Sequence, residues 1–246
     1  MLREHLLHRQ HENGFRWRGS EIARIEGLSD AVFAFAVTLL VVSLEVPKTF
    51  NELAVLMRGF VPFAICFFLL MQVWHEQYRY FRRYNLQDAT SVILNAVLLF
   101  VVLFYVYPLK FLFSFLVNQW MGLPQTVRVA GGAMENIIEP HQMPELMAIF
   151  NAGYLAVAVI FMLLFGHALR QRHTLELTPV EVFATKTSVG AAALQASVAA
   201  ISLGMVAFGG QRLGGMSGVV YPILLGPGFT IYYSVMARKR RKLETD

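Results

Sequence analysis

Charged and polar side chains cluster where the first apolar segment of the chain begins. The run 28–46 is mainly apolar, and Arg24, Glu26, Ser29 and Asp30 lie at or just before its start. Ionisable groups at membrane depth are costly and are usually paired or turned toward water. Arg24 and Asp30 are six residues apart, so they do not share one face of a helix. We therefore expect each of them to meet a partner on another helix.

Two later segments supply candidate partners. His75 lies at the end of the second apolar run, and Asn95 lies just inside the third. In antiparallel neighbours, the start of the first run, the end of the second and the start of the third share one membrane level. We expect Arg24, Ser29, Asp30, His75 and Asn95 to form one polar cluster there. His75 either holds helices together as a buried, hydrogen-bonded side chain or titrates in step with conformation.

One face of the first run is apolar apart from a single hydroxyl. Steps of three and four residues define one stripe of a helix. By itself, the stripe is typical of ordinary helix packing, in which the Thr hydroxyl bonds back to the carbonyl of residue 34. The stripe consists of Leu28, Ala31, Phe35, Thr38, Leu39, Val42 and Val46.

The composition shows what kind of protein positions these residues. The chain has 246 residues, of which 56% are hydrophobic and 15% are charged, whereas a soluble domain carries about 25% charge. This excludes an ordinary cytosolic domain, a disordered chain and a nucleic-acid-binding module. A span needs about 20 apolar residues, and such continuous runs do not alternate as barrel strands do. The apolar runs lie at roughly 28–46, 53–74, 90–117, 146–168, 186–209 and 214–236.

We therefore predict an all-α membrane protein with six transmembrane helices, forming a single six-span domain over residues 1–246. A short basic tail at 1–23 precedes the spans, and a basic tail at 237–246 follows them. Cytoplasmic loops carry an excess of Lys and Arg, so the predicted spans place both termini in the cytoplasm. Sixteen of the 21 basic residues fall on that side, namely Arg3, Arg9, Arg16, Arg18, Arg24, Arg79, Arg82, Arg83, Arg170, Arg172, Lys186, Arg238, Lys239, Arg240, Arg241 and Lys242.

Residues that would support other chemistry are sparse. The single cysteine, Cys66, excludes a disulfide framework within the chain and a cysteine-based zinc site. His5, His8 and His11 have regular spacing but no carboxylate or thiol support for a metal, so we expect no metal site and no cofactor. The apolar spans hold no repeated carboxylate pair, so we expect no enzyme. A small secondary transporter, with 226–228 (Gly-Pro-Gly) breaking the last span, and an accessory membrane subunit stay open as alternatives.

The first span also carries a specific motif. It resembles the first-helix signature R-x-x-x-F-S-D-x-x-x-A-x-x-x-T-x-L-x-x-x-L-x-x-P of the transmembrane-protein-175 family of lysosomal and prokaryotic potassium channels. Leu28 replaces the Phe, and eight of the nine fixed positions over 24 residues match. The matching residues are Arg24, Ser29, Asp30, Ala34, Thr38, Leu40, Leu44 and Pro47. Spans one to three carry the resemblance, and spans four to six fit in hydropathy.

The resemblance implies a potassium-selective or potassium-preferring channel, built as a homotetramer in the inner membrane of a prokaryote. Its partners would be potassium ions and the lipid bilayer, with no nucleic acid. One first helix from each subunit would surround the pore, without the T-V-G-Y-G filter of ordinary potassium channels. Phe35, at a position where the family usually has Ile or Leu, would form the constriction. Leu39 and Val42 would form the next layers, and Thr38 would place a hydroxyl beside the constriction.

Overall fold

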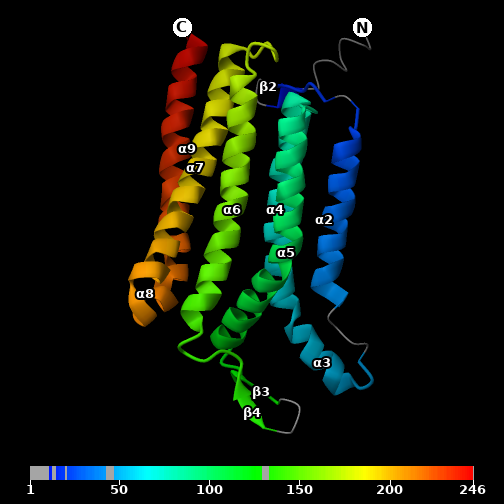
Figure 1. Cartoon of the computed structure of the whole chain (residues 1–246), viewed down its shortest axis with the longest axis vertical. Coiled ribbons are helices and arrows are strands. Elements are labelled where there is room, and N and C mark those ends of the chain that lie inside the picture. The colour runs from blue at the N-terminus through cyan, green and yellow to red at the C-terminus, as the bar shows by residue number, and fades with distance from the viewer. Residues whose placement is uncertain (1–10, 13–14, 20, 43–46, 129–132, 246) are drawn as a thin grey trace.

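The protein, seen as a computed structural model, is a bundle of long helices (Figure 1). The structure describes residues 11–12, 15–19, 21–42, 47–128 and 133–245. The helices are α2 (Arg24–Val42), α3 (Phe50–Arg58), α4 (Phe60–Tyr84), α5 (Ala89–Trp120), α6 (Met143–Arg170), α7 (Pro179–Phe208), α8 (Gly210–Met216) and α9 (Val220–Thr245), with a 3-10 turn at Ser217–Val219.

Two short antiparallel hairpins accompany the helices. Strand β1 (His11–Glu12) pairs with β2 (Phe15–Arg16), and β3 (Thr126–Arg128) pairs with β4 (Met134–Asn136). The second hairpin lies within the long polar connection that follows α5, at the end of the bundle opposite the start of α2 (Figure 1). These strands are too short to change the fold class.

The expected all-helical membrane architecture is confirmed. Among the described residues, five helical segments are long and apolar enough to cross a membrane: α4, α5, α6, α7 and Leu213–Arg241. Helix α2 has 19 residues and carries Arg24, Glu26 and Asp30 within its first two turns. It lies at one edge of the bundle, alongside the longer helices (Figure 1).

The helices depart from the apolar runs in two places. The second run, expected at 53–74, is divided between α3 and α4, and α4 continues through a charged stretch to Tyr84. Asn85 ends it in the left-handed conformation, with φ of 50°. Hydropathy marks how deep a residue sits in lipid, whereas a helix continues until its backbone is capped. Helix α9 also runs unbroken through Pro227, so 226–228 does not break the last span.

The bundle is organised around neighbouring pairs. Helix α7 packs on α6 and α9, α5 packs on α6, and α2 packs on both α4 and α5. The start of α2 and the end of α9 lie at the same end of the bundle, which we call the terminal end (Figure 1). The start of the first long helix and the end of the last lie at one end of a bundle whenever the number of long helices is even.

Near the terminal end, buried aromatic rings join α4 to α6. Tyr80 and Tyr84 of α4 pack edge to face with Phe165 of α6, with ring centroids 5.7 and 6.3 Å apart. Each Tyr hydroxyl has a partner, since Tyr80 lies 3.1 Å from Ser91 and Tyr84 lies 2.8 Å from Thr185. A buried polar tip needs such a partner, so these contacts fix where α4 lies relative to α5, α6 and α7.

Part of the expected basic tail is anchored in this region. Phe15 is buried with its ring 5.5 Å from that of Tyr84. Arg18 donates two hydrogen bonds to the Glu181 carboxylate, at 3.1 and 2.9 Å. Glu181 also accepts from the backbone N–H groups of Arg16 and Thr178, both at 2.9 Å. Residues 15–18 therefore join the start of α7 to the end of α4.

Candidate pore-lining face

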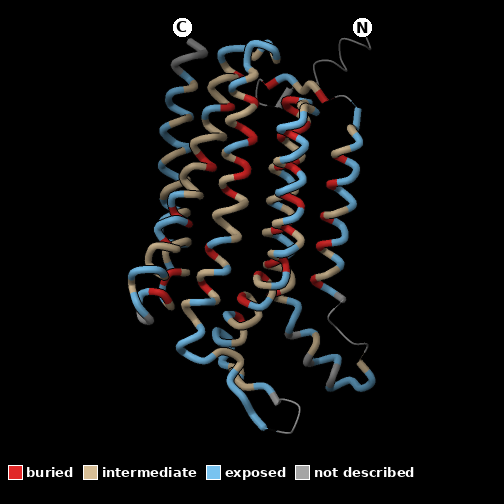
Figure 2. Tube along the Cα trace, viewed as in Figure 1, coloured by how far each residue is buried: buried red, intermediate tan, exposed pale blue. Residues whose placement is uncertain are grey.

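Helix α2 has one buried side and one exposed side. Steps of three and four residues connect Glu26, Ser29, Phe33, Ala36 and Leu40, and each is at most 6% exposed. Figure 2 shows the buried positions of α2 on the side that faces the rest of the bundle. This spacing is the one a helix uses to place a single stripe against its neighbours. Within the described part of the chain, the opposite side of α2 is exposed.

The predicted stripe lies mostly on that exposed side. Leu28 is 60% exposed and Phe35 is 56% exposed, and Ala31 and Thr38 are also exposed. The Thr38 hydroxyl donates to the carbonyl of residue 34 at 2.9 Å, as expected for a Thr inside a helix. The stripe is therefore an apolar surface carrying one hydroxyl, three residues after Phe35.

The deeper members of the stripe are placed differently. Leu39 is half-buried and packs against the core. The side chain of Val42 and all of Val46 lie outside the described residues. In the single chain, Phe35 and Thr38 thus mark the centre of the exposed side, and Leu39 lies at its border with α4 and α5.

A buried hydrogen-bond chain holds the opposite side of α2. The Asn95 side chain of α5 donates to the Ser29 hydroxyl at 2.9 Å, and Gln77 of α4 donates to Asn95 at 3.1 Å. All three are at most 2% exposed. Polar groups away from water are stable only when bonded. The chain therefore specifies both the height and the rotation of α2 against its two neighbours.

The structure brings together only part of the expected polar cluster. Asp30 accepts a hydrogen bond from the indole N–H of Trp74 at 2.8 Å. Arg24 and His75 are exposed, and His75 stacks on Tyr78 with ring centroids 6.3 Å apart. Within the described residues, no hydrogen bond or ion pair joins Arg24 or His75 to Ser29, Asp30 or Asn95. Ser29 and Asn95 meet as predicted, whereas Asp30 bonds elsewhere.

Three partners of α2 lie outside the five residues of the predicted cluster. Gln77 completes the buried chain, and Trp74 binds Asp30. Lys110 of α5 donates to the Leu40 carbonyl at 2.6 Å and so holds the far end of α2. Gln77 and Trp74 stand in the polar stretch that ends the second apolar run, which is a usable signal. Lys110 has no such signal, because a lone Lys near a span end usually indicates only topology.

Comparison with known proteins identifies the family to which this chain belongs. A family model described as the endosomal/lysosomal potassium channel TMEM175 matches residues 24–105. A potassium channel of Marivirga tractuosa is 37% identical over 236 residues, which cover 94% of each chain. The chain belongs to the TMEM175 family. The expected resemblance is thereby confirmed, and the matched region begins at Arg24 and contains every predicted site residue.

Other TMEM175 relatives agree. A potassium channel of Chamaesiphon minutus is 29% identical over 157 residues, covering 61% of this chain and 66% of that relative. A solved structure of a variant of the potassium channel MtTMEM175, in complex with a nanobody–MBP fusion, superimposes with a TM-score of 0.76. It is 35% identical, with 96% of this chain and 99% of that chain covered. The TMEM175 family comprises ion channels, so the expectation that the chain is not an enzyme is confirmed.

Proposed function

We propose that this chain is a potassium channel whose pore is lined by the exposed side of α2 from four identical subunits. Membership of the TMEM175 family supports potassium conduction. The observation that supports the choice of α2 is its division into two sides. One side is held by α4 and α5, while the side carrying Phe35 and Thr38 faces away from the whole bundle. A helix at the edge of a subunit can meet its copies around a central axis.

Phe35 is the narrowest point of this proposed pore. Four aromatic rings at one level leave little room for a hydrated cation, and an apolar constriction gates by losing its water. Potassium releases its water more readily than sodium, so such a ring modestly favours potassium. Thr38, one turn away, supplies the only hydroxyl of the stripe and helps to coordinate a partly dehydrated ion. Leu39 and Val42 form the next layers.

The buried chain of Ser29, Asn95 and Gln77 serves this pore by orienting it. A rotation of α2 would move Phe35 off the axis and would break hydrogen bonds that have no water to replace them. Asp30, bonded to Trp74, adds a second restraint at the same end of the helix. Arg24 and His75 are exposed in the single chain, and we assign them to contacts at the subunit boundary.

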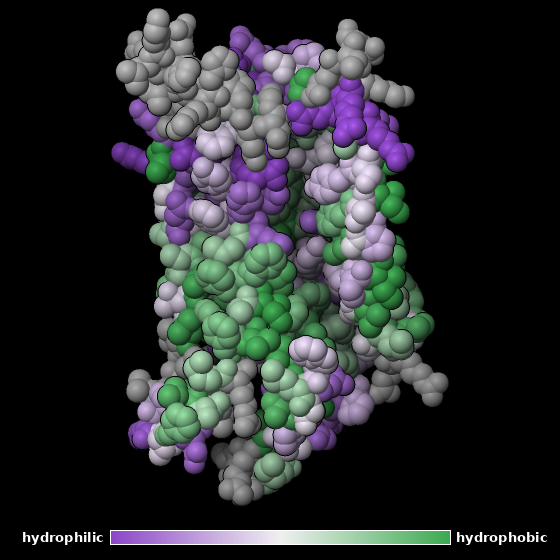
Figure 3. All heavy atoms as spheres, turned by 180° about the vertical axis from the view of Figure 1, so that it is seen from behind, coloured by the Kyte–Doolittle hydropathy of each residue, from purple (hydrophilic) through white to green (hydrophobic). Residues whose placement is uncertain are grey.

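The topology follows from charge. We place α2 in the membrane as the first of six spans, with both termini in the cytoplasm and the channel in the inner membrane of a prokaryote. The terminal end carries the basic residues of the α6–α7 turn and of the last turns of α9 (Figure 1). Figure 3 shows hydrophilic side chains gathered toward that end above a hydrophobic band. This distribution supports the positive-inside orientation.

The decisive experiment compares two phenylalanines of α2. Phe35→Ala is expected to raise unitary conductance and to reduce discrimination between potassium and sodium, because the ion would keep more of its water. Single-channel recording of the reconstituted protein, with each cation in turn, measures both. Unitary currents also distinguish a channel from the transporter and accessory-subunit alternatives.

Phe33→Ala is the matched control, because Phe33 is 1% exposed and lies on the packed side of α2. Removing it leaves a cavity and costs roughly 3–5 kcal/mol in a soluble core, but it should leave unitary conductance unchanged. If the Phe35→Ala protein is stable and keeps the conductance and selectivity of the parent, then another surface lines the pore.

A further inference from the structure

Helix α5 is hydrogen-bonded to α2 at two levels. Near the terminal end, the Asn95 side chain donates to the Ser29 hydroxyl at 2.9 Å. Toward the opposite end, the Lys110 ammonium donates to the Leu40 carbonyl at 2.6 Å. Phe35 lies between the two bonded positions of α2. The stretch of α2 that is proposed to form the constriction is therefore held on both of its sides.

The Lys110 bond fits the directions of the two helices. Both helices begin at the terminal end and run the same way (Figure 1). At 1.5 Å per residue, Leu40 lies about 16 Å beyond Ser29 along α2, whereas Lys110 lies about 22 Å beyond Asn95 along α5. Helical side chains lean toward the N-terminus, and the last carbonyls of a helix point beyond its C-terminus. The Lys110 side chain therefore covers a difference in level of about 6 Å by running back to the Leu40 carbonyl.

A proline in α5 explains why a long side chain is needed here. Pro108 lies inside α5, two residues before Lys110. Proline bends a helix because it has no backbone N–H and its ring clashes with the preceding turn. The last part of α5 slants away from α2 (Figure 1). Lys has a flexible four-carbon stem, which bridges two helices that separate at this level.

The Leu40 carbonyl is a position where α2 depends on an outside donor. Leu40 lies two residues before Val42, where the described helix ends, and the last four carbonyls of a helix are satisfied from outside it. A cationic donor suits this end, because a helix carries partial negative charge at its C-terminus. Leu40 is 1% exposed, so water does not readily replace the ammonium group there.

We propose that Lys110 is a positioning residue for the pore. By holding the Leu40 carbonyl, it fixes the level and rotation of the far half of α2, residues 35–42, which includes Phe35 and Thr38. This role rests on the proposed function, because it takes the exposed side of α2 as the pore surface. A helix held at Ser29 alone is free to tilt and to fray beyond that point. Discrimination between potassium and sodium therefore depends on Lys110, although Lys110 itself contacts no ion.

The first test measures local opening of α2 without ion conduction. Lys110→Met keeps the length and the apolar stem of the side chain but removes the donor. In hydrogen–deuterium exchange of the purified full-length protein, the amides of residues 35–42 should exchange about tenfold faster, as expected for the loss of about 1.4 kcal/mol. Exchange in residues 27–32 should stay unchanged, because Asn95 still holds Ser29. Lys110→Arg keeps a charged donor and should restore the exchange of the parent.

The second test measures selectivity. In single-channel recording of the reconstituted protein, Lys110→Met should lose discrimination between potassium and sodium, and Lys110→Arg should recover it. A residue that only stabilised the fold would not change the selectivity of the channels that remain assembled. If Lys110→Met fails to fold, Lys110→Gln gives the same comparison with Lys110→Arg, because Gln keeps a donor but is too short to reach Leu40.

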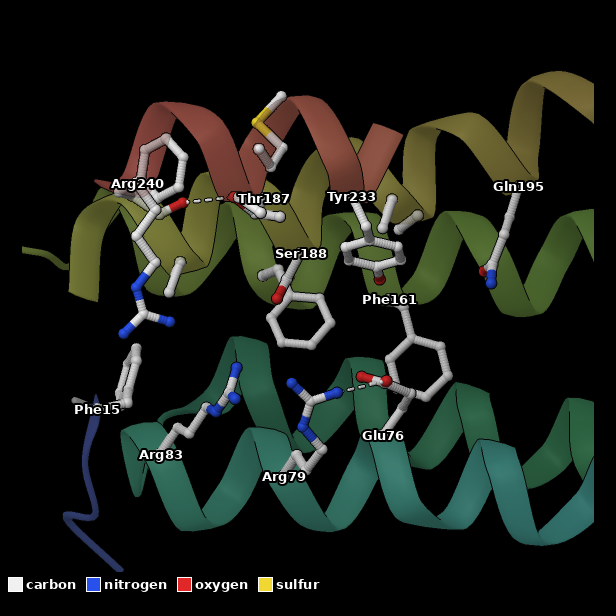
Figure 4. Close-up of a pocket in the computed structure, with 17 residues that line it drawn as sticks. Phe15, Glu76, Arg79, Arg83, Phe161, Thr187, Ser188, Gln195, Tyr233 and Arg240 are labelled. Atoms are coloured by element: carbon white, nitrogen blue, oxygen red, sulfur yellow. Dashed lines mark hydrogen bonds and ion pairs between the residues drawn. The ribbon is translucent and has the colours of Figure 1, made fainter. Parts of the chain in front are cut away.

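Two variants of α7 are the matched controls. Gln195 is half-buried, like Lys110, and lines a cavity of about 410 Å³ between α4, α7 and α9 (Figure 4). No described residue of α2 lines this cavity, so Gln195→Met removes a polar side chain from a part of the bundle away from α2. Lys186→Met removes an exposed lysine from the same helix. Both variants should keep the exchange of α2 and the selectivity of the parent.

Three results would overturn the proposal. The first is unchanged exchange of residues 35–42 in Lys110→Met, and the second is equal acceleration in residues 27–32, which indicates a general loss of stability. The third is faster exchange with unchanged selectivity in a protein whose conduction does respond to Phe35→Ala. If Phe35→Ala leaves conduction unchanged, the proposed pore fails instead, and the exchange data still decide whether Lys110 holds the far half of α2.

Discussion

Two phenylalanines of α2, only two residues apart, have opposite surroundings. Phe33 is 1% exposed and packs into the core, whereas Phe35 is 56% exposed. In an α-helix, residues two positions apart lie on nearly opposite sides, because one turn takes 3.6 residues. One residue type therefore has two different roles within a single turn. Phe33 anchors the helix, and Phe35 is available to whatever lies beyond the subunit.

Thr38 provides a prediction at the same scale. Thr38→Ala removes the only hydroxyl of the exposed stripe, so we expect open channels that discriminate less well between potassium and sodium. The hydrogen bond to the carbonyl of residue 34 lies within the helix, so its loss should barely change stability. Reversal potentials in mixed potassium and sodium solutions measure the effect.

Thr38→Ser is the control, because it keeps the hydroxyl and should keep the selectivity of the parent. A Thr38→Ala channel that is as selective as the parent would show that the hydroxyl serves only the helix, as it does in ordinary packing.

At the scale of elements, α5 and α6 approach closely at a glycine. A methyl group added at Gly153 of α6 would collide with the ring of Tyr105 on α5. The Tyr105 hydroxyl is held by the Phe150 carbonyl at 2.9 Å, so the ring has little freedom to move aside. Gly153→Ala should lower the melting temperature, because overpacking costs about 1–3 kcal/mol and outweighs the gain in helix propensity.

Gly166 of the same helix is the matched control, since nothing lies within 4 Å of a methyl group placed there. Gly166→Ala should leave the melting temperature unchanged or raise it, by up to about 1 kcal/mol of helix propensity. A shared response of the two variants would mean that helix propensity, and not the contact with Tyr105, decides the outcome.

The start of α5 predicts how stability depends on pH. Asp88 accepts hydrogen bonds from Ser91 at 2.8 Å and from the Thr90 backbone at 3.1 Å, and lies 2.9 Å from His167. Partial burial works to raise the pKa of Asp88, but the Ser91 hydrogen bond and the nearby His167 outweigh it and lower this pKa below its ordinary value. A carboxyl group whose pKa is depressed in the folded state stabilises the fold above its unfolded-state pKa. This stabilisation is lost as the pH falls through the folded-state pKa.

As the pH falls from about 5 to about 3, the melting temperature of the parent should therefore decrease more than that of the Asp88→Asn variant. Asn also caps helix starts well, so the variant keeps the cap while removing the titration. Parallel pH profiles for the two proteins would show that the ionisation of Asp88 does not contribute.

At the scale of the whole molecule, the sidedness of the two ends can be tested directly. Asn136 lies on strand β4 and Thr245 ends α9, at opposite ends of the bundle (Figure 1). We expect cysteines introduced by Asn136→Cys and Thr245→Cys to react from opposite sides of the membrane with an impermeant thiol reagent. The native Cys66 is buried and should stay silent. Labelling of both positions from one side would contradict the predicted topology of six spans and the tetramer proposed from it.

The sequence predicted the long apolar helices well and their ends less well. The runs that begin at 90 and 146 lie within α5 and α6, because apolar residues fill the whole length of these helices. The second run, 53–74, gave the wrong helix end, because α4 continues through charged residues to Tyr84, which is buried against Phe165. The left-handed cap at Asn85, and not hydropathy, decided where that helix ends.

The sequence by itself determined the membrane class, the motif of the first helix, and hence the channel family, because composition and fixed spacing are properties of the chain alone. Only the tertiary structure decided which side of α2 is exposed and which residues hold the other side. Asn95 donates to Ser29, and Gln77 donates to Asn95, from three helices that are separate in sequence. Such pairs depend on the rotation and height of each helix, which packing sets and no local pattern encodes.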